Sequence, residues 1–156
     1  MSELKQKWNQ VVISNPVPMS GMGIHNLINL MQEVEPFKYV ILEDMEGIAE
    51  EHFLPILQEQ HYTRMRLKDL IPMLLDVKYL KLGTFYLFKE YPENWDDTDH
   101  TFDAYLVGPS NSTIRIVDKN NTYVYTPHES VVEIIKKNYI IEEIKTDFLE
   151  GLDYPY

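Results

Sequence analysis

Apolar residues recur along this chain at helical spacing in some segments and at strand spacing in others. Between 24 and 34 they fall every three or four residues, which predicts an amphipathic helix of about three turns. A similar stripe at 67–75 predicts a helix interrupted at Pro72. A weaker stripe at 48–57 predicts a helical region that Pro55 must break or restart. The predicted helix content therefore lies mostly in the first half.

Strand patterns dominate the second half. Runs at 83–88 and 102–107 are aromatic or alternating, and the runs at 113–117 and 122–126 flank a polar loop typical of a hairpin. Short apolar runs at 11–13 and 37–42 add strand candidates earlier in the chain. The pattern predicts an α+β fold, in which an antiparallel sheet of 3–5 strands, mostly within residues 83–126, packs against several helices.

The clearest local signal is the segment Thr126–Glu129, which has the sequence of a capping box with proline at the first helical position. In that motif the Thr126 hydroxyl accepts the amide of Glu129, and the Glu129 carboxylate reaches back to the amide of Thr126. The segment predicts a helix that ends near Asn138. Its buried face is expected to contain Val131, Val132, Ile134 and Ile135.

The length of the chain indicates one domain. With 156 residues it can bury about 70% of the surface that the unfolded chain exposes. No internal repeat, low-complexity tract or linker long enough to divide it is visible, so we expect a single globular domain over 1–156. Its acidic and aromatic end, at 146–156, either docks on this domain or is partly flexible.

The charge of the chain limits the classes of partner. The formal net charge is −11, and the one local basic cluster, at 64–68, is too small for a nucleic-acid or anionic membrane surface. A basic protein is favoured, because opposite charges steer association. The alternative is that the charge serves solubility alone. Cysteine is absent and the N-terminus lacks an apolar signal segment, so we expect a cytoplasmic protein.

Acidic and aromatic residues are concentrated together at 90–103. This stretch has six carboxylates, three aromatic rings and no lysine or arginine. Aromatic side chains anchor many interfaces, and carboxylates orient a basic partner. The predicted partner-binding surface consists of Tyr91, Glu93, Trp95, Asp96, Asp97, Asp99 and Asp103. Two alternatives are a hydrated loop between strands and a loose divalent metal site; a calcium loop is excluded because Phe102 and Gly108 occupy its glycine and glutamate positions.

Catalytic motifs are not evident in the chain. The five histidines include no zinc-protease pair, and no serine lies in a nucleophile elbow. The segment Ser20–Gly23 has only the start of a phosphate-binding loop, so a helix entry capped by Ser20 is the favoured interpretation. We therefore expect no enzymatic activity, no cofactor and no bound metal.

Three functional hypotheses follow from these patterns. The leading one is a non-enzymatic acidic binding protein that masks a basic surface on a partner protein. An immunity protein or inhibitor of a nuclease, or of another nucleic-acid-acting enzyme, is its most concrete form. One alternative is a small enzyme or ligand-binding protein with a metal or polar site near His100 and Asp103. The other is a dimeric acidic chaperone or adaptor.

Overall fold

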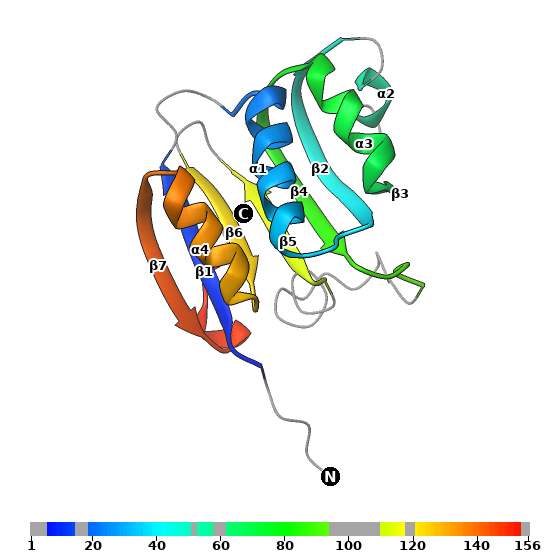
Figure 1. The fold of residues 1–156 in the computed structure, drawn as a ribbon. Coiled ribbons are helices and arrows are strands. Elements are labelled where there is room, and N and C mark those ends of the chain that lie inside the picture. The colour runs from blue at the N-terminus through cyan, green and yellow to red at the C-terminus, as the bar shows by residue number, and fades with distance from the viewer. Residues whose placement is uncertain are drawn as a thin grey trace.

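The computed structural model describes residues 6–14, 19–50, 53–57, 62–93, 110–117 and 121–153 (Figure 1). Within these ranges seven strands form one sheet, in which all neighbouring strands are antiparallel. The strands are β1 (Trp8–Ser14), β2 (Tyr39–Ala49), β3 (Tyr62–Arg66), β4 (Val77–Phe88), β5 (Ser112–Ile116), β6 (Asn121–Thr126) and β7 (Ile141–Asp147). The helices are α1 (Gly21–Val34), α2 (Leu54–Leu57), α3 (Leu67–Met73) and α4 (Glu129–Asn138), with 3-10 turns η1 (Leu74–Asp76) and η3 (Leu149–Gly151).

The sheet is larger than the predicted one and draws on more of the chain. Its strand order is β3-β2-β4-β5-β6-β1-β7. Strands β1, β2, β3 and β7 lie outside 83–126, and β4 already begins at Val77. The prediction of 3–5 strands, mostly within 83–126, is therefore wrong. The predicted strand at 102–107 lies outside the described residues.

The two edge strands explain most of this error. Strand β3 reads YTRMR and β7 reads IEEIKTD, so both place charged residues where sequence rules for strands expect apolar ones. Charged side chains are common on edge strands, where they oppose pairing with other molecules. Ile48 was expected in a helix but lies in β2, which continues to Ala49.

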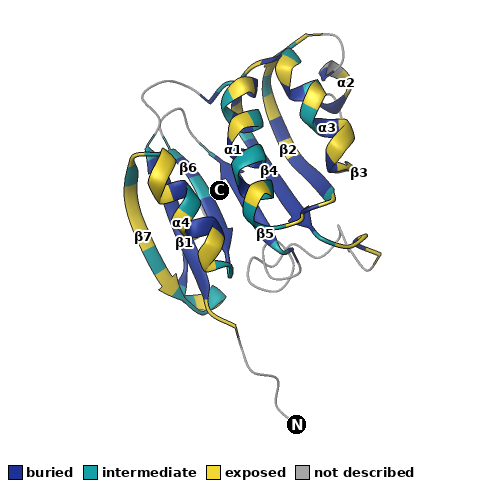
Figure 2. Cartoon of the chain, in the orientation of Figure 1, coloured by how far each residue is buried: buried dark blue, intermediate teal, exposed yellow. Residues whose placement is uncertain are grey.

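The helices cover one face of the sheet (Figure 1), and their outward surfaces are the exposed ones (Figure 2). Helix α1 confirms the predicted amphipathic helix: Ile24, Leu27, Ile28 and Met31 are buried in the core beneath it. Its start is capped by the Ser20 hydroxyl, which accepts a hydrogen bond from the Gly23 amide at 3.0 Å. No helix within the described residues is long and apolar enough to cross a membrane.

Helix α4 begins later than the capping box predicts. Its first residue is Glu129 and His128 is the N-cap residue, without a side-chain capping bond. The Thr126 hydroxyl instead accepts the amide of His128 at 3.1 Å, and it receives a hydrogen bond from Ser112 at 2.8 Å. The Thr126 side chain is thus hydrogen-bonded to Ser112 of the adjacent strand β5, and it does not form the hydrogen bond of the predicted capping box. The predicted burial of Val131, Val132 and Ile135 is confirmed, whereas Ile134 is only partly buried against the core.

The opposite face of the sheet has a second, aromatic core. Its buried residues are Trp8, Ile41, Tyr86, Phe88, Tyr125 and Leu152, with Tyr39 and Tyr123 packed against them. The segment after β7 lies on this face. Its Leu152 side chain is buried, and the backbone carbonyl of Asp153 accepts a hydrogen bond from the Tyr125 hydroxyl. This face also contains the candidate sites described next.

Candidate functional site

The structure describes two of the residues predicted to bind a partner. Tyr91 and Glu93 follow β4, and both are exposed. The other predicted residues lie outside the described part of the chain: Trp95, Asp96, Asp97, Asp99 and Asp103, together with His100 of the alternative site.

Tyr91 is exposed and yet held in place. About half of it, 51%, is accessible to solvent. Its ring meets the ring of Tyr39 edge to face, with centroids 5.5 Å apart. The Arg64 guanidinium carbon lies 5.5 Å from the Tyr91 ring centroid, and Nη1 of Arg64 donates to the Tyr91 hydroxyl at 3.3 Å. Two strands, β2 and β3, therefore support this exposed aromatic side chain.

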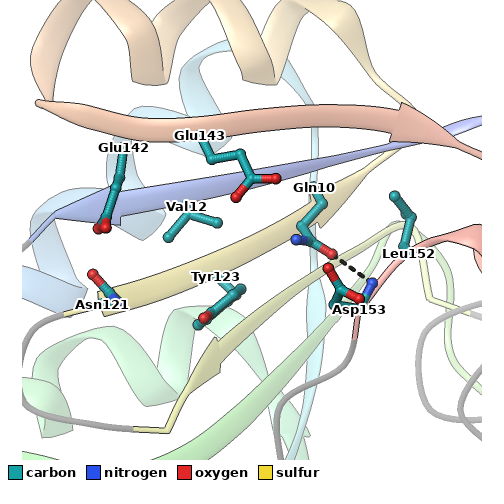
Figure 3. A pocket seen from close by; sticks show the side chains of 8 residues that line it. All are labelled: Gln10, Val12, Asn121, Tyr123, Glu142, Glu143, Leu152 and Asp153. Atoms are coloured by element: carbon teal, nitrogen blue, oxygen red, sulfur yellow. Dashed lines mark hydrogen bonds between the residues drawn. The ribbon is translucent and has the colours of Figure 1, made fainter.

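A cavity of about 440 Å³ lies on the same face of the sheet, over β1, β6 and β7 (Figure 3). Its volume is within the range of small-ligand sites. Val12 and Leu152 supply apolar lining. The polar lining consists of Gln10, Asn121, Tyr123, Glu142, Glu143 and Asp153.

Sequence patterns did not identify this cavity, because its lining comes from β1, β6, β7 and the segment that follows η3, which only the fold brings together. Strand β1 lies between β6 and β7, so Val12 is the neighbour of Tyr123 on one side and of Glu143 on the other. The adjacent pair Glu142 and Glu143 was a visible signal, but nothing in the sequence connects it to Gln10. Within the described residues, no group of three or more His, Cys, Asp or Glu side chains is arranged to hold a metal ion.

A buried arginine occupies the middle of this face. Arg115 is only 3% exposed, and its Nη1 donates to the Thr84 hydroxyl and lies 3.8 Å from Oδ2 of Asp44. Asp44 has a φ of 57° and lies where β2 loses register with β4. Aspartate tolerates this left-handed conformation better than most residues, and bulges commonly re-aim a side chain. The bulge thus directs a carboxylate toward the buried guanidinium.

A third polar cluster joins α1, β4 and α4 at one end of the sheet. The Glu35 carboxylate receives a hydrogen bond from the Lys89 ammonium and lies 3.4 Å from both the His128 Nδ1 atom and the Ser130 hydroxyl. Within the described residues the His128 Nε2 atom is buried and has no partner. Because a buried Nε2 cannot reach a ligand, we interpret this cluster as a structural tie between the helices and the sheet.

This cluster makes the stability of the fold dependent on pH. The hydrogen bond from Lys89 lowers the pKa of Glu35 below its ordinary value of 4.5, although burial opposes it. Burial lowers the pKa of His128 below its ordinary value of 6.5, although Glu35 opposes that shift. The unfolded chain therefore takes up protons at both residues at a higher pH than the folded chain does.

We expect the free energy of unfolding to fall as the pH falls. The His128 contribution is complete above pH 6.5 and is lost below it, and the Glu35 contribution is lost below pH 4.5. Urea unfolding from about pH 7.5 to about pH 4 measures this loss. In His128→Asn the loss between about pH 7 and pH 5 should be smaller than in the wild type. An equal loss in both proteins would contradict the assignment to His128.

Comparison with known proteins adds nothing to these observations: the chain matches no family model, no curated protein and no solved structure.

Proposed function

We propose that this chain is an acidic, non-enzymatic binding protein that masks a basic surface on a partner protein. The most concrete form is an immunity protein or inhibitor of a nuclease or another nucleic-acid-acting enzyme. The observation that carries this proposal is Tyr91, an exposed aromatic side chain held by Tyr39 and Arg64 at the start of the acidic stretch 90–103.

The geometry of Tyr91 is that expected of an interface anchor. Tyrosine is enriched among the residues that contribute most to binding. A side chain that is already fixed loses little conformational entropy when a partner covers it. Ring contact with Tyr39 and the hydrogen bond from Arg64 supply this fixation, while 51% of Tyr91 remains accessible to a partner.

The charge of the chain supports a basic protein as the partner. A net charge of −11 attracts a surface that normally binds phosphate groups, and it repels nucleic acid and anionic membranes. Carboxylates of the acidic stretch would then form ion pairs with the lysine and arginine side chains of the partner, in place of phosphate groups. The proposal places this interaction in the cytoplasm, since a chain without cysteine suits a reducing compartment.

Substitution of Tyr91 tests this proposal in the complex with the partner. We expect Tyr91→Ala to weaken binding about 30-fold, the effect of losing a contact worth about 2 kcal/mol. Tyr91→Phe is the matched control: it keeps the ring and its contact with Tyr39 but loses the hydrogen bond from Arg64. Its affinity should remain within about threefold of the wild type. Isothermal titration calorimetry measures both affinities.

The predicted acidic residues are tested in the same complex. Replacing Asp96, Asp97 and Asp99 by lysine should lower the association rate and the affinity, because the steering charge is reversed. Unchanged affinity in both this variant and Tyr91→Ala would refute the proposed binding surface.

A further inference from the structure

Gln10 is a buried residue with one hydrogen-bonding group directed into the cavity. Only 2% of it is exposed. Its Oε1 atom accepts the backbone amide of Asp153 at 2.9 Å, which fixes the orientation of the side-chain amide. The Nε2 group must therefore point away from Asp153, toward the cavity (Figure 3). Within the described residues no hydrogen bond is made by this nitrogen, so the donor is available to an acceptor in the cavity.

The remaining polar lining favours a cationic ligand. Three carboxylates line the cavity, those of Glu142, Glu143 and Asp153. The Lys145 ammonium lies 3.8 Å from Oδ2 of Asp153 in an exposed pair, which contributes little binding energy. Glu143 has no hydrogen bond or ion pair with the part of the chain that the structure describes. The lining is thus negatively charged, and the Glu143 carboxylate is available to pair with a ligand.

The arrangement of the lining favours an extended cation with a flat head. Glu142 and Asp153 lie at opposite ends of the cavity, with Val12 and Tyr123 between them (Figure 3). A guanidinium group stacks on tyrosine rings, pairs with carboxylates through two hydrogen bonds and is weakly hydrated. The alkyl part of an arginine side chain would pack on Val12 and Leu152. A backbone carbonyl beside that side chain would accept the hydrogen bond from Gln10.

We propose that the cavity over β1, β6 and β7 binds an arginine side chain of the partner protein, with Glu143 pairing with the guanidinium and Gln10 donating to a backbone carbonyl. Only the assignment of this arginine to a partner protein rests on the proposed function. The chemistry of the cavity itself can be tested without the partner.

The probe is arginine with both backbone ends capped, N-acetylarginine N-methylamide, added to the full-length chain. We expect saturable shifts of the Gln10 side-chain amide signals in ¹⁵N-correlated NMR spectra, with a dissociation constant in the millimolar range. The capped citrulline analogue has nearly the same shape without the charge. It should bind at least about tenfold more weakly, and capped lysine should also bind more weakly than arginine.

Two variants with the same change of charge show where the probe binds. Glu143→Gln should weaken binding of the capped arginine about tenfold, because it removes the carboxylate that pairs with the guanidinium. Glu133→Gln removes the same charge from α4, on the opposite face of the sheet, and should leave the affinity unchanged. If capped arginine and capped citrulline bind equally, or if both variants lose affinity equally, the inference is overturned. Absence of any shift of the Gln10 signals would also overturn it.

Failure of this inference and failure of the proposed function give different results. If the chain binds a basic partner while capped arginine leaves the Gln10 signals unchanged, the cavity is not an arginine site and the proposed function stands. If capped arginine binds as expected but the chain has no basic partner, the arginine chemistry stands and the proposed function fails. A partner complex whose affinity is unchanged by Glu143→Gln would contradict the assignment of the arginine to the partner.

Discussion

Tyr86→Ala is expected to lower the free energy of unfolding by about 4 kcal/mol, the loss typical of removing a buried aromatic ring. Tyr86 is fully buried in β4, in the centre of the sheet face opposite the helices. Its ring packs in the aromatic core together with Ile41 and Tyr125. Removing the ring leaves a cavity that the rigid strands around it cannot close. Urea unfolding followed by circular dichroism measures the change.

The matched control separates the ring from its hydroxyl group. The Tyr86 hydroxyl donates to Oε1 of the buried Glu43 at 3.2 Å. Tyr86→Phe removes this hydrogen bond and keeps the ring, so its cost should be about 1–2 kcal/mol. If Tyr86→Ala cost no more than Tyr86→Phe, the face opposite the helices would not be a packed core.

Gly21→Ala is expected to destabilise the fold by about 2–3 kcal/mol, because the added methyl group has no space. A Cβ atom at Gly21 would lie 1.8 Å from the carbonyl oxygen of Leu74 and 2.6 Å from that of Val77. Both contacts are with backbone, so α1 would have to move away from η1 and the start of β4. The melting temperature and the urea midpoint should both fall.

Gly23→Ala is the control for this prediction, since it makes the same change two residues further along α1. The nearest atom to its Cβ would be Sδ of Met19 at 2.6 Å, at the flexible end of a side chain that can turn away. Alanine also favours a helix over glycine by about 1 kcal/mol. The stability of Gly23→Ala should therefore stay close to that of the wild type. Equal losses in the two variants would contradict the close approach of Gly21 to the backbone.

Local patterns predicted those elements whose residues face a core. The stripe at 24–34 corresponds to α1 because that helix has one buried side, which gives its sequence a helical period. Strand β6 buries Val124 on one face of the sheet and Tyr125 on the other, so its β-branched and aromatic residues, rather than an alternation, identify it as a strand. Strands β3 and β7 have charged residues at the sheet edges. Strand β3 pairs with β2, the strand before it in the chain, whereas β7 pairs with β1 at the other end of the sequence. The ladder hydrogen bonds with those partners, rather than local propensity, determine that these segments are extended.

The candidate sites differ in how far sequence could predict them. Tyr91 and Glu93 were identified because acid and aromatic residues are adjacent in the chain. The supports of Tyr91, Tyr39 and Arg64, come from strands that no local pattern places beside it. The cavity depends on β1 lying between β6 and β7, a topology that local periodicity does not encode. Gln10, the residue that orients the proposed ligand, has no signature of its own in the sequence.

The proposed masking of a basic surface is tested by the salt dependence of binding to a partner isolated from the source cells. The chain is used as bait at low salt, the bound protein is identified by mass spectrometry, and its affinity is then measured at increasing salt concentration. We expect a basic protein whose affinity falls steeply with salt, because charges are paired across the interface. An acidic partner, or an affinity that does not change with salt, would contradict it.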